Sequence, residues 1–220
     1  MNVENRFRTT FALPAGSVGS VVFAMWIAVG LLFGAVGAAN AQAAGHPAQE
    51  KVESVVGEVL EILATRQDEI AADPSILDDT VDQLIVPNLD FSTMTKLTVG
   101  KSWRKANEGQ RTELVSEFKN FLLNAYSSAL REFGGENIEF QPYKKNKRDD
   151  RAVVDSVFVQ GANKVPVTYK LHNRKGPWVI YDIVVSDLSL VLQYKASFSN
   201  EIERSGIQGL IDLLKERNGT

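Results

Sequence analysis

Apolar residues recur every three or four positions over much of the N-terminal half of the chain. The recurrence begins at Val52 and stops at Asp73-Pro74, which predicts a helix over residues 50–72. Ser75 follows as the expected N-cap of a second helix, which Pro87 ends. This region is therefore predicted to consist of one amphipathic helix followed by a shorter one.

The most regular helical pattern lies near the middle of the chain. A short helical piece over residues 90–99 precedes it, and Asn107 is its expected N-cap. An apolar stripe then runs along one face until Gly134-Gly135 ends the helix. The stripe consists of Leu114, Phe118, Phe121, Leu122, Ala125 and Ala129.

The hydrophobic period changes to two after the long helix, which indicates strands. The clearest alternation places Val167 and Tyr169 on one face and Lys170 and His172 on the other. One face of the sheet is therefore expected to be buried and the other to meet water. Because the links are short, we expect a twisted antiparallel meander of four strands, spanning residues 138–143, 152–160, 165–171 and 178–185.

The helical period returns after Ser186-Asp187, and a last short helix is expected after Gly206. The order of helices, four strands and helices predicts an α+β fold. We expect a single domain over residues 50–216, with a flexible start over 44–49 and a tail over 217–220.

The N-terminus has the composition of an export signal. Two arginines precede an almost uncharged stretch over residues 21–39, and small residues follow up to Ala41 and Ala43. We expect a signal peptide over residues 1–43, cleaved near one of these two alanines; an uncleaved membrane anchor is the alternative. Since the chain has no cysteine, the exported domain forms no disulfide, and a bacterial periplasm is the expected compartment.

The charge balance argues against nucleic acid as a partner. The net charge is −3 for the whole chain, and it becomes −4 without residues 1–43. The one strongly basic run is 144–148, for which we expect a solvated hairpin tip that blocks edge-to-edge association. Contact with anionic headgroups or with an acidic partner is the alternative function of this run.

Candidate catalytic groups are few. There is no cysteine and no G-x-S-x-G motif, and of the two histidines His46 falls in the expected flexible start. His172 is expected to be an exposed residue at a strand end. Asp155 and Asp182 are the two aspartates of the expected strands, and Asp182 is expected to accept hydrogen bonds rather than to act as a base. No metal-ligand spacing is present.

Several segments in order are similar to those of the MlaC-like, or toluene-tolerance, family, and the resemblance covers nearly all of Val52 to Leu214. One departure is Ser186-Asp187, where the family usually has an acidic residue followed by glycine. The similar segments are 86–91, 100–104, 108–111, 118–126, 178–183 and 188–191, followed by Tyr194, Phe198, Ile202, Gly206 and 210–211.

The resemblance implies a periplasmic phospholipid carrier that serves an ABC-type intermembrane lipid transport system and needs neither catalytic residue, metal nor cofactor. Its implied partners are an inner-membrane ABC complex and an outer-membrane lipoprotein. Two alternatives stay open: a carrier of hopanoid or another isoprenoid lipid, and a cystatin-like or NTF2-like enzyme with a polar pocket.

Periodicity alone does not separate a filled core from a pocket wall, but the resemblance implies a pocket between sheet and helices. The candidate lining residues are the large apolar side chains of the long helix, the strands and the following helix. They are Phe118, Phe121, Leu122, Tyr126, Phe158, Val167, Tyr169, Trp178, Tyr194 and Phe198.

Overall fold

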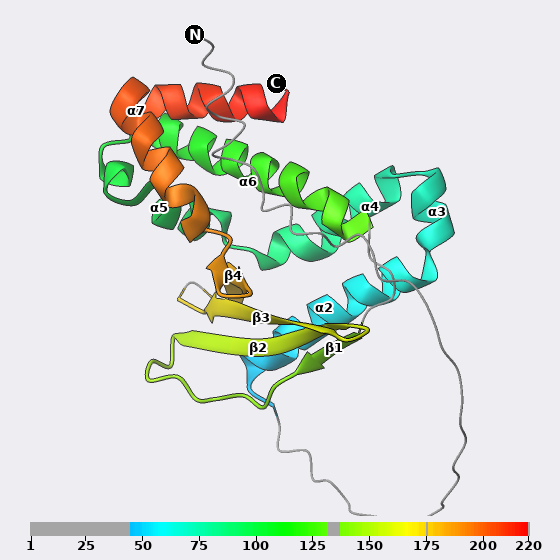
Figure 1. Ribbon diagram of the computed structural model, residues 1–220. Helices are drawn as coiled ribbons and strands as arrows, with labels where there is room; N and C mark the ends of the chain where they lie inside the picture. The colour runs from blue at the N-terminus through cyan, green and yellow to red at the C-terminus, as the bar shows by residue number, and fades with distance from the viewer. Residues whose placement is uncertain (1–44, 132–136, 175, 220) are drawn as a thin grey trace, which may run out of the picture. The chain divides into compact units, whose positions relative to one another are not determined.

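The structure is a computed structural model that describes residues 45–131, 137–174 and 176–219 (Figure 1). The expected signal peptide over residues 1–43 and the expected helix end at Gly134-Gly135 lie outside the described residues. Residues 44–220 form one compact unit. Within the described part of this unit, no helix is both long enough and apolar enough to cross a membrane.

The N-terminal region is helical, as predicted, but it is more divided. The helix expected over 50–72 is interrupted at Arg66, and its first part begins at Pro47 because the His46 side chain accepts a hydrogen bond from the Ala48 N–H. Order therefore starts within the segment expected to be flexible. The pieces are α2 (Pro47–Thr65), α3 (Gln67–Ala72), α4 (Ser75–Thr80), the π-helical η1 (Val81–Ile85) and the 3₁₀ turn η2 (Val86–Asn88).

Side-chain caps explain three of the helix starts among the described residues, at His46, Asp90 and Asn107. The expected cap at Ser75 is wrong, because the Asp73 carboxylate accepts from both the N–H and the hydroxyl of Ser75. Asn107 is confirmed as a cap, since its Oδ1 accepts from the Gln110 N–H at 2.9 Å. The helices that follow η2 are α5 (Phe91–Val99), the 3₁₀ segment η3 (Gly100–Arg104) and α6 (Glu108–Arg131).

The sheet is antiparallel throughout and has the strand order β1-β2-β3-β4-β5. It contains one strand more than the four predicted, because the chain pairs again after a tight turn at Ser186 and Asp187. These residues have φ of 47° and 66°, so two non-glycine residues adopt the left-handed conformation of the turn. The strands are β1 (Asn137–Phe140), β2 (Arg151–Gln160), β3 (Asn163–His172), β4 (Val179–Val185) and β5 (Leu188–Ser189).

A β-bulge in β4 breaks the alternation of inward and outward side chains. Asp182 pairs with Lys170, whereas Ile180 pairs with Leu171, so Tyr181 is an extra residue in the register. Because directly paired residues share a face, Ile180 and Ile183 both lie on the face of Tyr169 and Leu171, and Asp182 lies on the opposite face.

The C-terminal helices pack against α6. After the 3₁₀ turn η4 (Leu192–Tyr194), α7 (Lys195–Asn218) bends at Gly206, whose φ of 75° accounts for the predicted division into two helices. Its second half lies beside α6 (Figure 1). At the end of α7, Lys215 Nζ donates to Glu113 Oε2 of α6, and Asn218 Nδ2 donates to Glu117 Oε2, each at 2.8 Å.

Candidate functional site

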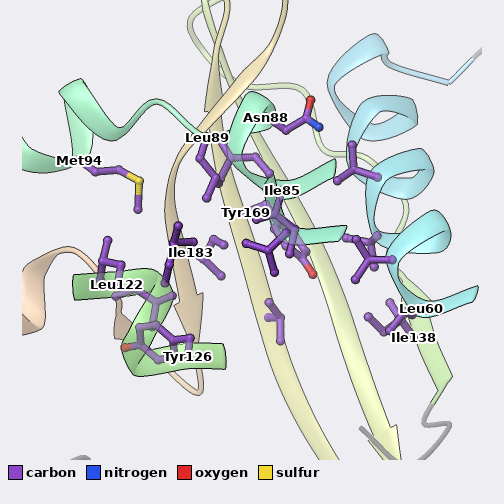
Figure 2. Close-up of a pocket in the computed structure, with 18 of the residues that line it drawn as sticks. Leu60, Ile85, Asn88, Leu89, Met94, Leu122, Tyr126, Ile138, Tyr169 and Ile183 are labelled. Atoms are coloured by element: carbon purple, nitrogen blue, oxygen red, sulfur yellow. The ribbon is translucent and has the colours of Figure 1, made fainter. Parts of the chain in front are cut away.

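The main cavity lies between the inner face of the sheet, α2, η1 and the C-terminal half of α6 (Figure 2). Its volume is about 380 Å³. Among the residues described as lining it, only Asn88, Tyr126 and Tyr169 carry a side-chain nitrogen or oxygen, and none carries a charge. A cavity of this size and composition suits an apolar ligand.

Two helices supply opposite walls of the cavity. In α2, the lining residues Val55, Val56, Val59, Leu60 and Leu63 are spaced so that they form one helix face. Across the cavity, α6 contributes Leu122, Leu123 and Tyr126 (Figure 2). The apolar stripes predicted for these helices thus face each other across open space at this level.

The sheet forms the third wall. Val167 and Tyr169 of β3 point into the cavity, and the bulge turns both Ile180 and Ile183 of β4 toward it. At the far end, Phe158 lines the cavity beside its β1 partner Ile138. The turns η1 and η2 and the start of α5 complete the lining with Val81, Ile85, Asn88, Leu89, Phe91 and Met94, and Leu190 adds to it after β5.

The three polar lining residues have partners. The Asn88 amide donates to the Leu84 carbonyl at 2.6 Å, and the Tyr126 hydroxyl accepts from Gln193 Nε2 at 2.6 Å. Burial raises the pKa of Tyr169, and a hydrogen bond with Ser156 opposes that rise. The three groups are one amide and two phenols, so the described lining residues include no carboxylate, histidine or lysine to act as a general base.

Five of the ten predicted pocket residues line this cavity: Leu122, Tyr126, Phe158, Val167 and Tyr169. The other five do not. Four of these form an aromatic cluster between α6 and the following helices, with ring centroids 5.1 to 6.4 Å apart in the contacts that join them. These four are Phe118, Phe121, Tyr194 and Phe198, and the fifth, Trp178, packs beside His46 at 5.3 Å.

Several residues that line the cavity are not among the ten predicted pocket residues. The α2 face was recognised as apolar but was not assigned to a pocket, although its five lining residues form an uninterrupted helix face. Ile180 and Ile183 were omitted because a strict period of two puts them on opposite faces. No pattern in the sequence marked the bulge.

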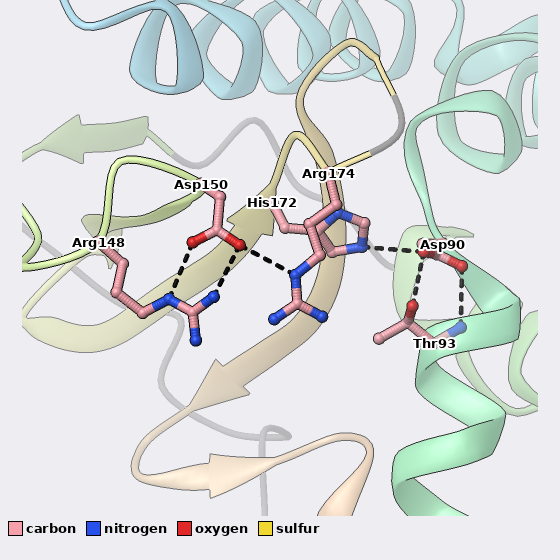
Figure 3. A network of polar contacts seen from close by, with 6 residues as sticks. All are labelled: Asp90, Thr93, Arg148, Asp150, His172 and Arg174. Carbon is pink, nitrogen blue, oxygen red and sulfur yellow. Dashed lines mark hydrogen bonds and ion pairs between the residues drawn. The ribbon is translucent and has the colours of Figure 1, made fainter.

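His172 and Asp182 lie on the face of the sheet opposite the cavity, and both are buried. This is contrary to the expectation that this face meets water. His172 is 4% exposed, because the start of α5 covers this end of the sheet, and its Nε2 lies 2.9 Å from Asp90 Oδ2 (Figure 3). Its Nδ1 has no hydrogen-bond partner among the described residues. The expectation of an exposed strand-end histidine is therefore wrong.

Both carboxylates in this region have structural partners. Asp90 caps α5 by accepting from the N–H and hydroxyl of Thr93, and these bonds with that of His172 lower its pKa although burial alone would raise it. Asp182 accepts from Lys170 Nζ at 2.9 Å and from the Ser189 hydroxyl at 2.8 Å. Among the described residues, no group of three or more histidine or acidic side chains could hold a metal ion.

Comparison with known proteins gives one consistent result. The model of the MlaC protein family matches residues 53–216. The toluene tolerance protein ttg2D of Pseudomonas putida is 24% identical over 165 residues, which cover 74% of this chain and 76% of that protein. The intermembrane phospholipid transport system binding protein MlaC of Haemophilus influenzae is 18% identical over 158 residues, or 70% and 74% of the two chains.

A solved structure shares both the fold and part of the sequence. It is the phospholipid-binding protein from Ralstonia solanacearum in complex with a phospholipid. The two structures superpose with a TM-score of 0.73 at 30% sequence identity, and the match covers 79% of this chain and 98% of that one.

Proposed function

The chain belongs to the MlaC family, and on this premise we propose that it carries phospholipid between membranes with the acyl chains held in the cavity between α2, α6 and the sheet. Proteins of this family are carriers rather than enzymes. The observation that carries the proposal is the chemistry of the cavity wall, which offers apolar side chains and no charge. The phospholipid bound to the Ralstonia solanacearum protein supports the same ligand class.

The energetics of lipid transfer explain why such a wall is sufficient. Two acyl chains of roughly fifteen methylenes each represent on the order of 20 kcal/mol of exposure to water. A cavity that resembles the membrane interior removes most of this cost, so the lipid enters and leaves with little change in free energy. The carrier then has no bond to make or break and needs no catalytic group.

We further propose the finer setting of this transport. The carrier acts in the periplasm after removal of residues 1–43, and it exchanges lipid with an inner-membrane ABC complex and an outer-membrane lipoprotein. The name of the Haemophilus influenzae relative, a binding protein of an intermembrane phospholipid transport system, supports such partners. Leu122, Tyr126, Phe158, Val167 and Tyr169 are proposed to touch the acyl chains.

The test combines lipid content with a variant that fills the cavity. Protein expressed from its complete sequence is purified without detergent, and its lipid is extracted and identified by mass spectrometry. We expect glycerophospholipid at near one per chain. Val167→Trp places an indole in the cavity, so we expect it to lower the lipid content by about tenfold or more without unfolding the protein.

Val153→Trp is the matched control. Val153 is a half-buried valine of β2 that pairs with Lys170 on the opposite face of the sheet and does not line the cavity. Its replacement makes the same change in size, and we expect it to keep the lipid. Lipid-free wild-type protein, or equal lipid contents in the two variants, would contradict the proposed function or the proposed wall.

A further inference from the structure

A second hollow lies at the N-terminal end of α2, outside the apolar cavity. It is an open recess of about 450 Å³ between His46 and the loop over residues 141–150 that joins β1 to β2. Lys145, Arg148 and Arg151 line it, together with the carboxylate Asp149. Three of the seven residues that line the recess are thus lysine or arginine, whereas no described lining residue of the main cavity is charged.

The loop that carries these cations is packed against the domain. The Tyr143 ring stacks on the His46 ring with centroids 4.0 Å apart and planes 9° from parallel. Tyr143 also packs against the buried cluster beneath the sheet, and the Gln141 N–H donates to the Asp155 carbonyl at 2.9 Å. The basic run is therefore presented on an anchored loop ten residues long between the paired strands β1 and β2.

Asp150 orients two of the arginines. Its carboxylate accepts from Nε and Nη2 of Arg148, both at 2.9 Å, and from Nε of Arg174 at 3.0 Å (Figure 3). Hydrogen bonds from Arg148 and then Arg174 lower the pKa of Asp150 to about 2, so this carboxylate stays ionised near neutral pH. Both guanidinium groups keep further N–H donors for an external acceptor.

The remaining cations have less local compensation. Arg151 lies over the Tyr181 ring with its guanidinium carbon 4.5 Å from the centroid. Lys144, Lys145 and Lys147 are exposed, and none of them forms an ion pair with a described residue. We define the basic surface as Lys144, Lys145, Lys147, Arg148, Arg151 and Arg174, which are accompanied by the carboxylates Asp149 and Asp150.

The opposite end of α2 has the opposite charge. From residue 66 to residue 82, Arg66 is the only cation against six carboxylates. The 19 residues of α2 separate the two ends by about 28 Å, and the helix dipole adds positive potential at the basic end. A negatively charged plane would attract one end of the molecule and repel the other, which would fix its orientation.

We propose that the basic surface docks the protein on a membrane surface rich in anionic phospholipid. Flexible lysines suit a plane of mobile phosphates, and the two arginines held by Asp150 can each donate more than one hydrogen bond to a phosphate group. An acidic protein partner fits less well. The two tyrosines beside these cations, Tyr143 and Tyr181, are half-buried and are covered by His46 and Arg151, so neither offers an exposed apolar centre for a protein interface. The proposal rests on the proposed function only in that a lipid carrier must reach a membrane.

Vesicle flotation tests the docking. Protein expressed from its complete sequence is mixed with vesicles of phosphatidylcholine, with or without phosphatidylglycerol, at low and high salt. We expect binding to the anionic vesicles that weakens as salt rises. Lys144→Glu, Lys145→Glu and Lys147→Glu together should weaken that binding by about tenfold or more.

The control is a triple variant with the same change in charge at another exposed surface: Lys96→Glu, Lys101→Glu and Lys105→Glu, in α5 and just after it. We expect it to bind anionic vesicles nearly as well as the wild type. Equal losses in the two triple variants, or equal binding to neutral and anionic vesicles, would overturn the proposal. Normal vesicle binding by the first triple variant, with slower lipid exchange with a partner complex, would overturn it in favour of an acidic protein.

Measuring lipid content in the same samples separates the two proposals. Wild-type protein that contains phospholipid but does not bind anionic vesicles would refute docking without contradicting the carrier function. Lipid-free protein that still binds anionic vesicles, and loses that binding when Lys144, Lys145 and Lys147 are replaced, would refute the carrier function and support docking.

Discussion

The two halves of α6 use one apolar stripe in different ways. In the first half, Leu114 and Phe118 have no exposed surface and lie where α7 packs against the helix. In the second half, Leu122 and Tyr126 face open space in the main cavity. Each half places a leucine four positions before an aromatic residue, so the difference comes mainly from what lies opposite them.

The difference shows what turns a helix face into a pocket wall. Opposite the first half, Phe198 and Tyr194 fill the space with aromatic rings. Opposite the second half, side chains of α2 and of the sheet line the cavity that Leu122 and Tyr126 face. One helix therefore forms part of the filled core with its first half and part of the cavity wall with its second half.

A matched pair of substitutions tests this comparison and should give the largest effect. Leu114→Ala leaves a new cavity in a filled region, so we expect the free energy of unfolding to fall by about 2–5 kcal/mol. Leu122→Ala removes the same atoms beside existing space, so we expect a loss of about 1–2 kcal/mol. Denaturant unfolding of both variants, after removal of lipid, measures the difference. Equal losses would mean that the two halves are packed alike.

The contact between Asp90 and His172 joins the start of α5 to the sheet, and its loss should have an intermediate effect. We expect Asp90→Asn to lower the free energy of unfolding by about 1–2 kcal/mol near neutral pH. Because folding lowers the pKa of Asp90 from 3.8, its ionised form stabilises the folded state above that pH.

The same contribution should disappear as the pH falls from 3.8 through the lower folded pKa. Wild type and Asp90→Asn should therefore converge in stability at acid pH, which denaturant unfolding over a pH series will show. A difference that stays constant down to the most acid pH would mean that the ionisation of Asp90 has no part in the contact.

The smallest effect on function is expected on the face of the sheet that does not line the cavity. Asp182→Asn keeps an oxygen acceptor for Ser189, and lipid transfer needs no proton donor or acceptor, so transfer between vesicles should stay within a few-fold of wild type. Asp155→Asn serves as the control, since Asp155 is the other aspartate in the described strands. A selective loss of several orders of magnitude in folded Asp182→Asn protein would favour an enzymatic role.

Much of the fold was predictable because it depends on local patterns. The periods of apolar residues gave the α+β order, Asn107 marked the start of α6, and Gly206 marked the bend in α7. The break at Arg66 was not predictable in the same way, because the apolar spacing continues across it. The fifth strand was missed since it is only two residues long and depends on positive φ at Ser186 and Asp187.

The site was only half predictable, because a cavity is defined by distances between elements. Tyr169 was found from strand alternation and Leu122 from the helical stripe, but Phe118 follows the same stripe and lies in the filled region. His172 was misjudged because its partner, Asp90, is 82 residues away in the chain. Long-range contacts of this kind leave no local pattern.

The bulge at Tyr181 also determines which changes in chain length β4 can absorb. Loss of the Tyr181 codon would shorten the strand by one residue, yet Ile180 and Asp182 would then alternate regularly and keep their present faces. Loss of a residue elsewhere in β4 would not be absorbed in this way, because a shift of one position moves every following side chain to the opposite face. Among homologues whose β4 differs in length by one residue, the deletion or insertion should therefore fall at this position.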